Sequence, residues 1–111
     1  MKPSIIGLAM APLLLFFCAS AAALTPPDAP RRAQLEHLLA QDCGACHGLH
    51  LTGGLGPALT AQALAGKPRA SLIATVTQGR PGTAMPAWEA LLSEGDIAWL
   101  VDILVQGNHA P

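Results

Sequence analysis

The sequence is poor in aromatic and charged side chains. Aromatic residues make up 4% of its 111 residues, tyrosine is absent, and charged residues make up 12%. Six basic and seven acidic side chains give a net charge of −1, which excludes the basic face that nucleic-acid binding requires. Of the three cysteines, Cys18 lies in the apolar N-terminal stretch, and a bridge between Cys43 and Cys46 would close too short a loop to organise a fold, which excludes a disulfide scaffold.

The first 23 residues have the pattern of a secretory signal. Lys2 supplies the positive start, residues 5–17 are apolar, and small residues at 19–21 and 21–23 offer cleavage sites. We therefore expect residues 1–23 to be a cleaved signal peptide and the protein to be periplasmic. The alternative is an uncleaved anchor, since no charge occurs between Lys2 and Asp28.

Removal of this segment would leave a domain with a thin core. Its only cysteines would be Cys43 and Cys46, its only methionine Met85, and its only aromatics besides histidine Trp88 and Trp99. A chain this small buries only about 60% of its unfolded surface and is marginal without reinforcement. A large apolar cofactor would supply the missing core.

Residues 43–47 read C-G-A-C-H, which is the attachment signature of a c-type haem. The spacing allows Cys43 and Cys46 to form thioethers with the two vinyl groups of one porphyrin edge. His47 then becomes the proximal axial ligand of the iron. The alternatives are a redox-active C-x-x-C pair and half of a zinc site. A redox pair needs no following histidine, and after removal of residues 1–23 no further cysteine would remain to complete a zinc site.

The spacing of apolar residues predicts an all-α domain over residues 31–107. A flexible proline-rich leader, residues 24–30, precedes it, and a tail, residues 108–111, follows. The domain should contain three to four short helices, over residues 31–41, 60–65, 68–78 and 93–107. Ser93 and Asp96 should form a capping box, and the glycine- and proline-rich segments 48–56 and 80–88 should be loops.

Met85 is the best candidate for the second axial ligand of the iron. It lies in a loop beside Pro86, whereas a methionine that only fills a gap in the core would be expected on an apolar helical face. The other histidines, His37, His50 and His109, are expected at the surface. With His47 and Met85 both bound, the iron would have no vacancy for a substrate.

The order of these motifs resembles a class I cytochrome c. C-G-A-C-H is followed by G-P-A-L at residues 56–59, by A-M-P at residues 84–86 and by a capped C-terminal helix. The resemblance implies a small class I fold around one covalent haem c. It also implies that the carbonyl of Pro57 accepts a hydrogen bond from the imidazole of His47.

The same resemblance implies that the N- and C-terminal helices cross beside the haem. Leu35 and Leu39 would then pack against three residues of the last helix: Leu100, Ile103 and Leu104. The aromatic pair common at that crossing is absent from this sequence.

More closely, the runs at residues 43–59 and 79–88 are similar to the NirC-type small cytochromes of denitrification nitrite-reductase operons. That resemblance implies a periplasmic, monomeric one-electron carrier, not an enzyme. Its redox partners would be the d-haem nitrite reductase or the enzymes that assemble the d-type haem. No nucleic acid is expected to bind, and no membrane if the signal is cleaved. The alternatives are a membrane-anchored subunit of a larger redox complex, and a ligand-binding haem sensor if Met85 dissociates.

Overall fold

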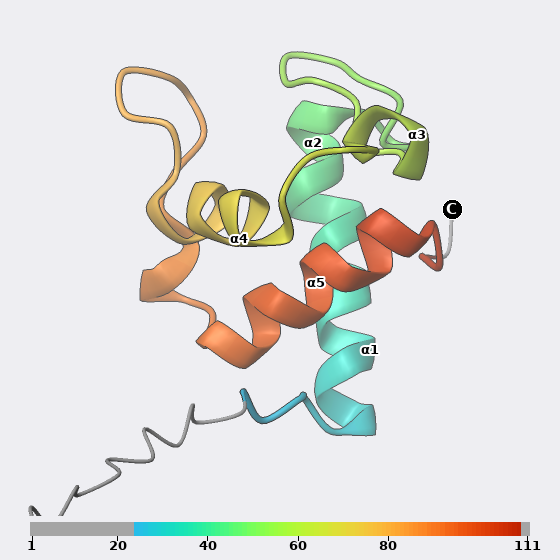
Figure 1. Ribbon diagram of the computed structural model, residues 1–111, viewed down its shortest axis with the longest axis vertical. Coiled ribbons are helices and arrows are strands. Elements are labelled where there is room, and N and C mark those ends of the chain that lie inside the picture. Colours follow the sequence, from blue (N-terminus) through green and yellow to red (C-terminus); the bar gives the residue numbers. More distant parts are fainter. Residues whose placement is uncertain (1–23, 110–111) are drawn as a thin grey trace, which may run out of the picture.

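A computed structural model of the chain describes residues 24–109, which form helices joined by irregular loops (Figure 1). In chain order the elements are α1 (Ala29–Leu38), the π-helix η1 (Leu39–Cys43), α2 (Gly44–His47), α3 (Ala61–Leu64), α4 (Arg69–Gln78), the 3-10 helix η2 (Trp88–Ala90) and α5 (Glu94–Gln106). No strand occurs in the described range, so the prediction of an all-α fold is confirmed. The predicted signal sequence and the last two residues of the predicted tail lie outside that range. Within it, no helix combines the length and apolar character needed to cross a membrane.

Helix α1 begins at Ala29, two residues before the predicted start at Arg31. The side chain of Asp28 accepts a hydrogen bond from the backbone N–H of Arg31 at 2.9 Å and so caps the first turn. Pro30 occupies that turn, where its missing N–H costs nothing. The predicted leader therefore ends at residue 28 rather than residue 30.

The first helical run does not end near Gln41, as the sequence predicted, but continues to His47. One turn is widened in η1, where the N–H of Gly44 donates to the carbonyl of Leu39, five residues back instead of four. Helix α2 follows without a break, and Gly48 ends the run with a φ of 95°. The C-G-A-C-H motif is thus helical over its whole length.

Helices α3 and α4 form close to where the sequence predicts them. The hydroxyl of Thr60 caps α3 by accepting from the N–H of Ala63 at 3.2 Å. Helix α4 ends at Gly79, which adopts a φ of 68°. Its apolar residues Leu72, Ile73 and Val76 are half-buried and pack against the core.

Helix α5 has the predicted capping box. The hydroxyl of Ser93 accepts from the N–H of Asp96, and the Asp96 carboxylate accepts from the N–H of Ser93, both at 3.1 Å. Gly107 ends the helix in the left-handed conformation with a φ of 69°. The predicted apolar stripe is buried along its whole length: Ile97, Leu100, Val101 and Leu104.

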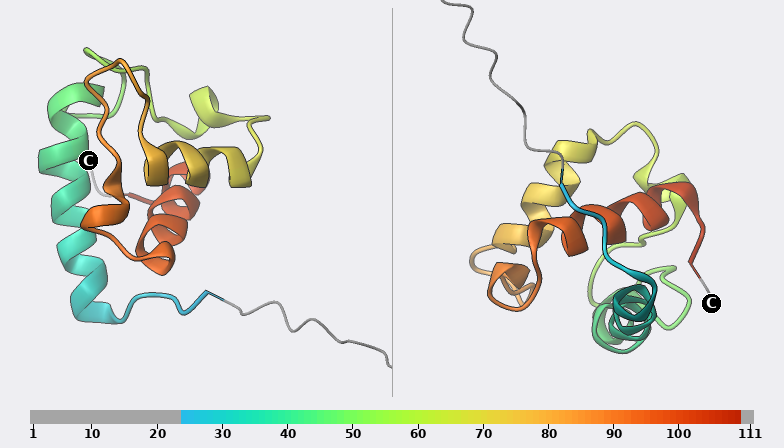
Figure 2. Two further views of the ribbon diagram at one scale, coloured as in Figure 1. Left: turned by 90° about the vertical axis from the view of Figure 1, so that its left-hand side faces the viewer. Right: turned by 90° about the horizontal axis from the view of Figure 1, so that it is seen from below.

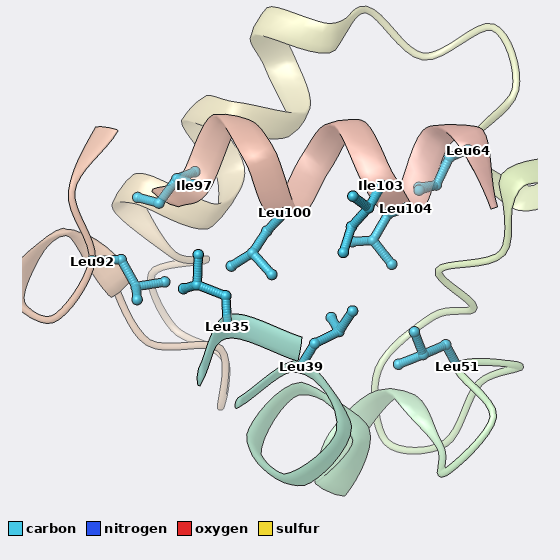
Figure 3. Close-up of a cluster of buried hydrophobic side chains, with 9 residues drawn as sticks. All are labelled: Leu35, Leu39, Leu51, Leu64, Leu92, Ile97, Leu100, Ile103 and Leu104. Atoms are coloured by element: carbon cyan, nitrogen blue, oxygen red, sulfur yellow. The ribbon is translucent and has the colours of Figure 1, made fainter. Parts of the chain in front are cut away.

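The core lies where α1 and α5 cross. Figure 2 shows the crossing from below, with α1 seen end-on and α5 running across it. The packing expected from the resemblance is confirmed, because Leu35 and Leu39 join a buried cluster with the α5 residues Leu100, Ile103 and Leu104 (Figure 3). Leu35 is fully buried, so its truncation to alanine would cost about 2–5 kcal/mol.

An ion pair also ties the two crossing helices. The guanidinium of Arg31 on α1 donates to the carboxylate of Asp96 on α5, with a shortest N–O distance of 2.8 Å. The Asp96 side chain is 8% exposed and that of Arg31 37% exposed. Hydrogen bonding to Arg31 lowers the pKa of Asp96 below its ordinary value of 3.8.

Residues 24–28 have no regular structure but pack along one face of α5. Pro27 is buried, and the carbonyl of Thr25 lies so close to Gly95 that a side chain at that glycine would overlap it. Half-buried Trp99 borders the same segment in a small hollow of about 100 Å³. The flexibility expected of the leader stays a prediction.

Candidate functional site

A cavity of about 730 Å³ opens between α2, α4, α5 and the two glycine-rich loops. All five site residues predicted from the sequence line it: Cys43, Cys46, His47, Pro57 and Met85. Most of the remaining wall is apolar, with Leu39, Leu55, Leu59, Leu64, Leu72, Val76, Trp88, Leu100, Val101 and Leu104. A volume of this size suits a cofactor, because ligand sites in proteins span about 300–1,000 Å³.

The two cysteines of the described range, Cys43 and Cys46, are unbridged thiols at the cavity wall. Their spacing of three residues on one helical run brings them to the same face of the helix. Burial raises the pKa of the Cys43 thiol to about 11. The two sulfurs are therefore accessible to a group in the cavity and are not consumed by each other.

His47 is held by a hydrogen bond from its ring to the neighbouring loop. Its Nδ1 lies 2.6 Å from the carbonyl oxygen of Pro57, the contact that the resemblance implied. A carbonyl can only accept, so Nδ1 carries the proton and Nε2 keeps its lone pair for a metal. The ring is only 8% exposed, and its orientation is fixed from the side away from Nε2.

Gly56 allows the loop to approach the histidine ring this closely. A Cβ at that position would lie 2.7 Å from Cε1 of His47 and 2.8 Å from Nδ1, both too short for real contacts. The backbone of Gly56 is held in place because its N–H donates to the carbonyl of Cys46 at 2.8 Å. Glycine is required here for close approach.

The segment from residue 48 to residue 56 is a folded loop, irregular as predicted. The N–H of Gly53 donates to the carbonyl of His47 at 2.8 Å, so the loop turns back over the end of α2. Leu51 is buried at 4% exposure despite a positive φ of 55°, which is rare for a residue with a side chain. The sequence analysis missed this anchor, whose only signal is one leucine among glycines.

Met85 reaches the same cavity from the second loop. Its carbonyl accepts from the N–H of Arg80 at 3.1 Å, and its N–H donates to the hydroxyl of Thr83 at 3.3 Å. Gly79 packs against this backbone, and a Cβ there would lie 2.7 Å from the carbonyl oxygen of Met85. Met85 lines the cavity and is not part of the buried cluster at the helix crossing.

The other histidines do not belong to the cavity. His37 and His50 are exposed and His109 is half-buried, and none of them lines the cavity wall. Over residues 24–109 no group of three or more His, Cys, Asp or Glu side chains could hold a metal ion. The zinc interpretation of the two cysteines therefore has no further ligands within the described chain.

Comparison with known proteins assigns the family. A family model described as "Cytochrome C oxidase, cbb3-type, subunit III" matches residues 30–103, which include every residue of the cavity wall except Leu104. The chain belongs to the cytochrome c family. It is a small c-type cytochrome with an all-helical fold, and its family consists of electron-transfer proteins that bind haem c.

Two relatives of this cytochrome carry the name "Cytochrome c55X". One, from Stutzerimonas stutzeri, is 68% identical over 106 residues, which are 96% of this chain and 91% of the relative. The other, from Pseudomonas aeruginosa, is 69% identical over 85 residues, 77% of this chain and 71% of the relative. A solved structure named "c-type cytochrome NirC" is 68% identical and has a TM-score of 0.75, covering 77% of this chain and all of that chain.

The cavity of this cytochrome fits the haem c that its family binds. Two thiols and an imidazole with a fixed Nδ1 proton are presented on one helix, as covalent attachment and axial ligation require. A thioether is available from the loop at residues 80–87, and the wall between is apolar. The donor set of sulfur and imidazole suits iron in a porphyrin better than a hard cation.

Proposed function

We propose that this cytochrome is a periplasmic one-electron carrier with a single haem c, attached through Cys43 and Cys46. His47 and Met85 would both ligate its iron. The proposal is supported above all by one observation: the imidazole with a free Nε2 and the only thioether of residues 24–109 line the same cavity. When bound, the haem supplies a reversible Fe(III)/Fe(II) couple.

The side chains of the cavity set the properties of that couple. Pro57 fixes the His47 proton at Nδ1, which keeps Nε2 a donor in both oxidation states. The Met85 thioether is a soft donor and favours the ferrous state, which raises the potential relative to a second imidazole. The apolar wall excludes water and disfavours the extra positive charge of the ferric state.

Ligation of the haem iron by two protein residues would also favour electron transfer over catalysis. With His47 and Met85 in place, the iron has no open position for nitrite, oxygen or peroxide. Neither ligand has to leave during electron transfer, so little reorganisation accompanies it. The partner is a redox protein, and we expect the contact to be small and brief, as electron-transfer encounters are.

We further propose that the partner is the d-haem nitrite reductase or an enzyme that assembles the d-type haem. This rests on the motif similarity to the NirC type and on the 68% identity to a structure carrying that name. The signal-like residues 1–23 support export to the periplasm. Reduction of the purified cytochrome by each candidate partner, followed by stopped-flow absorbance, tests the proposal. Exchange no faster than with an unrelated redox protein would refute it.

A second candidate is a cytochrome subunit of a larger membrane complex. The family model that matches residues 30–103 carries the name of an oxidase subunit, which favours this function. Fractionation of cells that produce the full chain distinguishes the free carrier from the membrane subunit. A soluble periplasmic form that starts after Ala21 or Ala23 supports the carrier, and a membrane-bound form with Lys2 retained supports the subunit.

Met85→Ala tests the ligand set directly. The variant should keep covalent haem, lose the weak red absorption band of methionine-ligated ferric iron and bind nitric oxide rapidly. Its potential should fall by more than about 59 mV, a tenfold change in equilibrium constant for one electron. Leu72→Ala is the matched control, because it removes apolar volume from the same cavity without removing a donor. Met85→Ala with an unchanged low-spin spectrum would show that another residue ligates the iron.

A further inference from the structure

The wall of the cavity contains two cations that the protein itself does not neutralise. The basic side chains of the described range are Arg31, Arg32, Lys67, Arg69 and Arg80. Arg31 pairs with Asp96 at 2.8 Å and Arg69 with Asp102 at 2.6 Å, while Arg32 donates to the carbonyl of Pro27 at 2.9 Å. Within residues 24–109, Lys67 and Arg80 have no such partner, and both line the cavity.

The remaining wall offers these two cations little compensation. Asp42 is the single acidic residue among those that line the cavity, and it is exposed. Most of the other lining side chains are apolar. A carboxylate that enters such a cavity needs a charged or hydrogen-bonding partner, because its desolvation is otherwise too costly.

A haem group has two carboxylate side chains, and the cavity has two cations without partners. We infer that Lys67 and Arg80 are the cationic partners of the haem carboxylates, an inference that rests on the proposed function. Arg80 can bind a carboxylate through two parallel N–H groups, whereas Lys67 acts as a point charge. Both side chains are exposed in part, so the pairs lie at the rim of the cavity and are screened by salt.

Arg80 also connects its proposed partner, a haem carboxylate, to the loop that contains Met85. Its N–H donates to the Met85 carbonyl at 3.1 Å, and its own carbonyl accepts from the N–H of Thr83 at 3.0 Å and the hydroxyl of Thr83 at 2.7 Å. The start of the Arg80 side chain is therefore fixed relative to Met85. A haem carboxylate bound by Arg80 would therefore also stabilise the loop that contains Met85.

The second cation comes from a different part of the cavity wall. Lys67 lies between α3 and α4, where its N–H donates to the carbonyl of Leu64 at 3.1 Å. Arg80 follows the other end of α4. Substitution of either residue therefore tests one pair without disturbing the backbone of the other.

The test uses the haem-loaded protein with Arg80→Gln, Lys67→Gln and Arg80→Lys. Arg32→Gln is the control, since it removes the same charge from an exposed arginine outside the cavity. Midpoint potentials come from spectroelectrochemical titration. Reduced-minus-oxidised infrared spectra report the carboxylate stretches, with the haem carboxylates labelled by ¹³C so that Asp and Glu do not contribute.

A cation near the iron disfavours the ferric state, so its removal lowers the potential. We expect Arg80→Gln and Lys67→Gln each to shift the electron-exchange equilibrium at least about threefold toward the ferric form, and each to shift the labelled carboxylate band. Arg80→Lys should restore most of the potential. Arg32→Gln should change neither the potential nor the band.

Three other outcomes are distinguishable. A lowered potential with an unshifted carboxylate band would mean that the cations act only as distant charges, and would overturn the inference. Unchanged potentials and bands with slower reduction by a partner would assign Lys67 and Arg80 to docking, and would overturn it as well. A wild-type protein without covalent haem would refute the proposed function itself.

Discussion

Asp96→Ala removes one carboxylate that performs two tasks in the fold. That side chain accepts the N–H of Ser93 at the start of α5 and the guanidinium of Arg31 on α1. It is 8% exposed, so the substitution removes hydrogen bonds to a largely buried charged group. Such losses cost about 1.5–3 kcal/mol in other proteins. We expect the free energy of unfolding to fall by about 2 kcal/mol.

For a domain of this length, about 1 kcal/mol moves the thermal midpoint by roughly 4–8 °C. The expected loss for the haem-loaded protein at pH 7 is therefore roughly 8–16 °C, measured by circular dichroism at 222 nm. Asp102→Ala is the matched control on the same helix, because the Arg69–Asp102 pair is exposed, at 52% and 38%. Exposed pairs contribute little, so this control should change the midpoint far less.

The pH dependence provides an independent check. Because Arg31 lowers the pKa of folded Asp96, its contribution to stability is complete above the ordinary value of 3.8. It is lost as the pH falls through the lower pKa of the folded state. The difference between wild type and Asp96→Ala should therefore be constant from pH 7 to about pH 5 and shrink below about pH 4. Equal losses for the two variants at pH 7, or a difference that grows as the pH falls below 4, would refute the reasoning.

Three further predictions concern the geometry around the motif. Gly56→Ala should displace His47 and lower the yield of covalent haem. Gly44→Ala is the control and should not lower the yield, because its Cβ would meet only an ordinary contact at 3.6 Å. Equal yields of the two variants would contradict the need for close approach of Gly56 to the His47 ring. Gly79→Ala should weaken the red methionine band while covalent haem is kept, and an intact band would show that the loop tolerates the Cβ. Deletion of Gln41 should convert η1 to regular α-helix and leave haem attachment intact. Deletion of Ala33, in contrast, should rotate the part of α1 before it by about 100° relative to the rest of the helix. This rotation should break the pair between Arg31 and Asp96 and lower the thermal midpoint. A midpoint equally low after both deletions would show that η1 is not a one-residue insertion.

The sequence predicted which residues would line the cavity, because their spacing follows from the chemistry of the haem c that the family binds. Two thioethers and an imidazole ligand would require two thiols and a histidine on adjacent turns, and Met85 is the only methionine of residues 24–109. The caps at Thr60 and Ser93 were equally accessible, since each depends on residues within one turn. Local chemistry therefore determined these predictions.

Features that depend on distant contacts were missed. The first helical run continues through η1 to His47, where Leu39 and Cys43 pack against the core formed with α5, and that contact comes from residues far along the chain. Leu51 combines a positive φ with a buried side chain, and none of its neighbours in the sequence indicates either feature. Lys67 and Arg80 are thirteen positions apart, and only the fold shows that both line the same cavity.

The route of the leader determines how the cytochrome can be tethered. The backbone of Thr25 lies against Gly95, and Leu24 and Pro26 border a hollow with Trp99. Leu100 and Leu104, in contrast, line the cavity from another face of α5. The described part of the leader therefore starts on the side of α5 away from the cavity. An anchored form and a released form would present the same face to a partner. Anchoring would limit the distance over which the cytochrome can diffuse to a partner, but it would not prevent electron exchange with that partner.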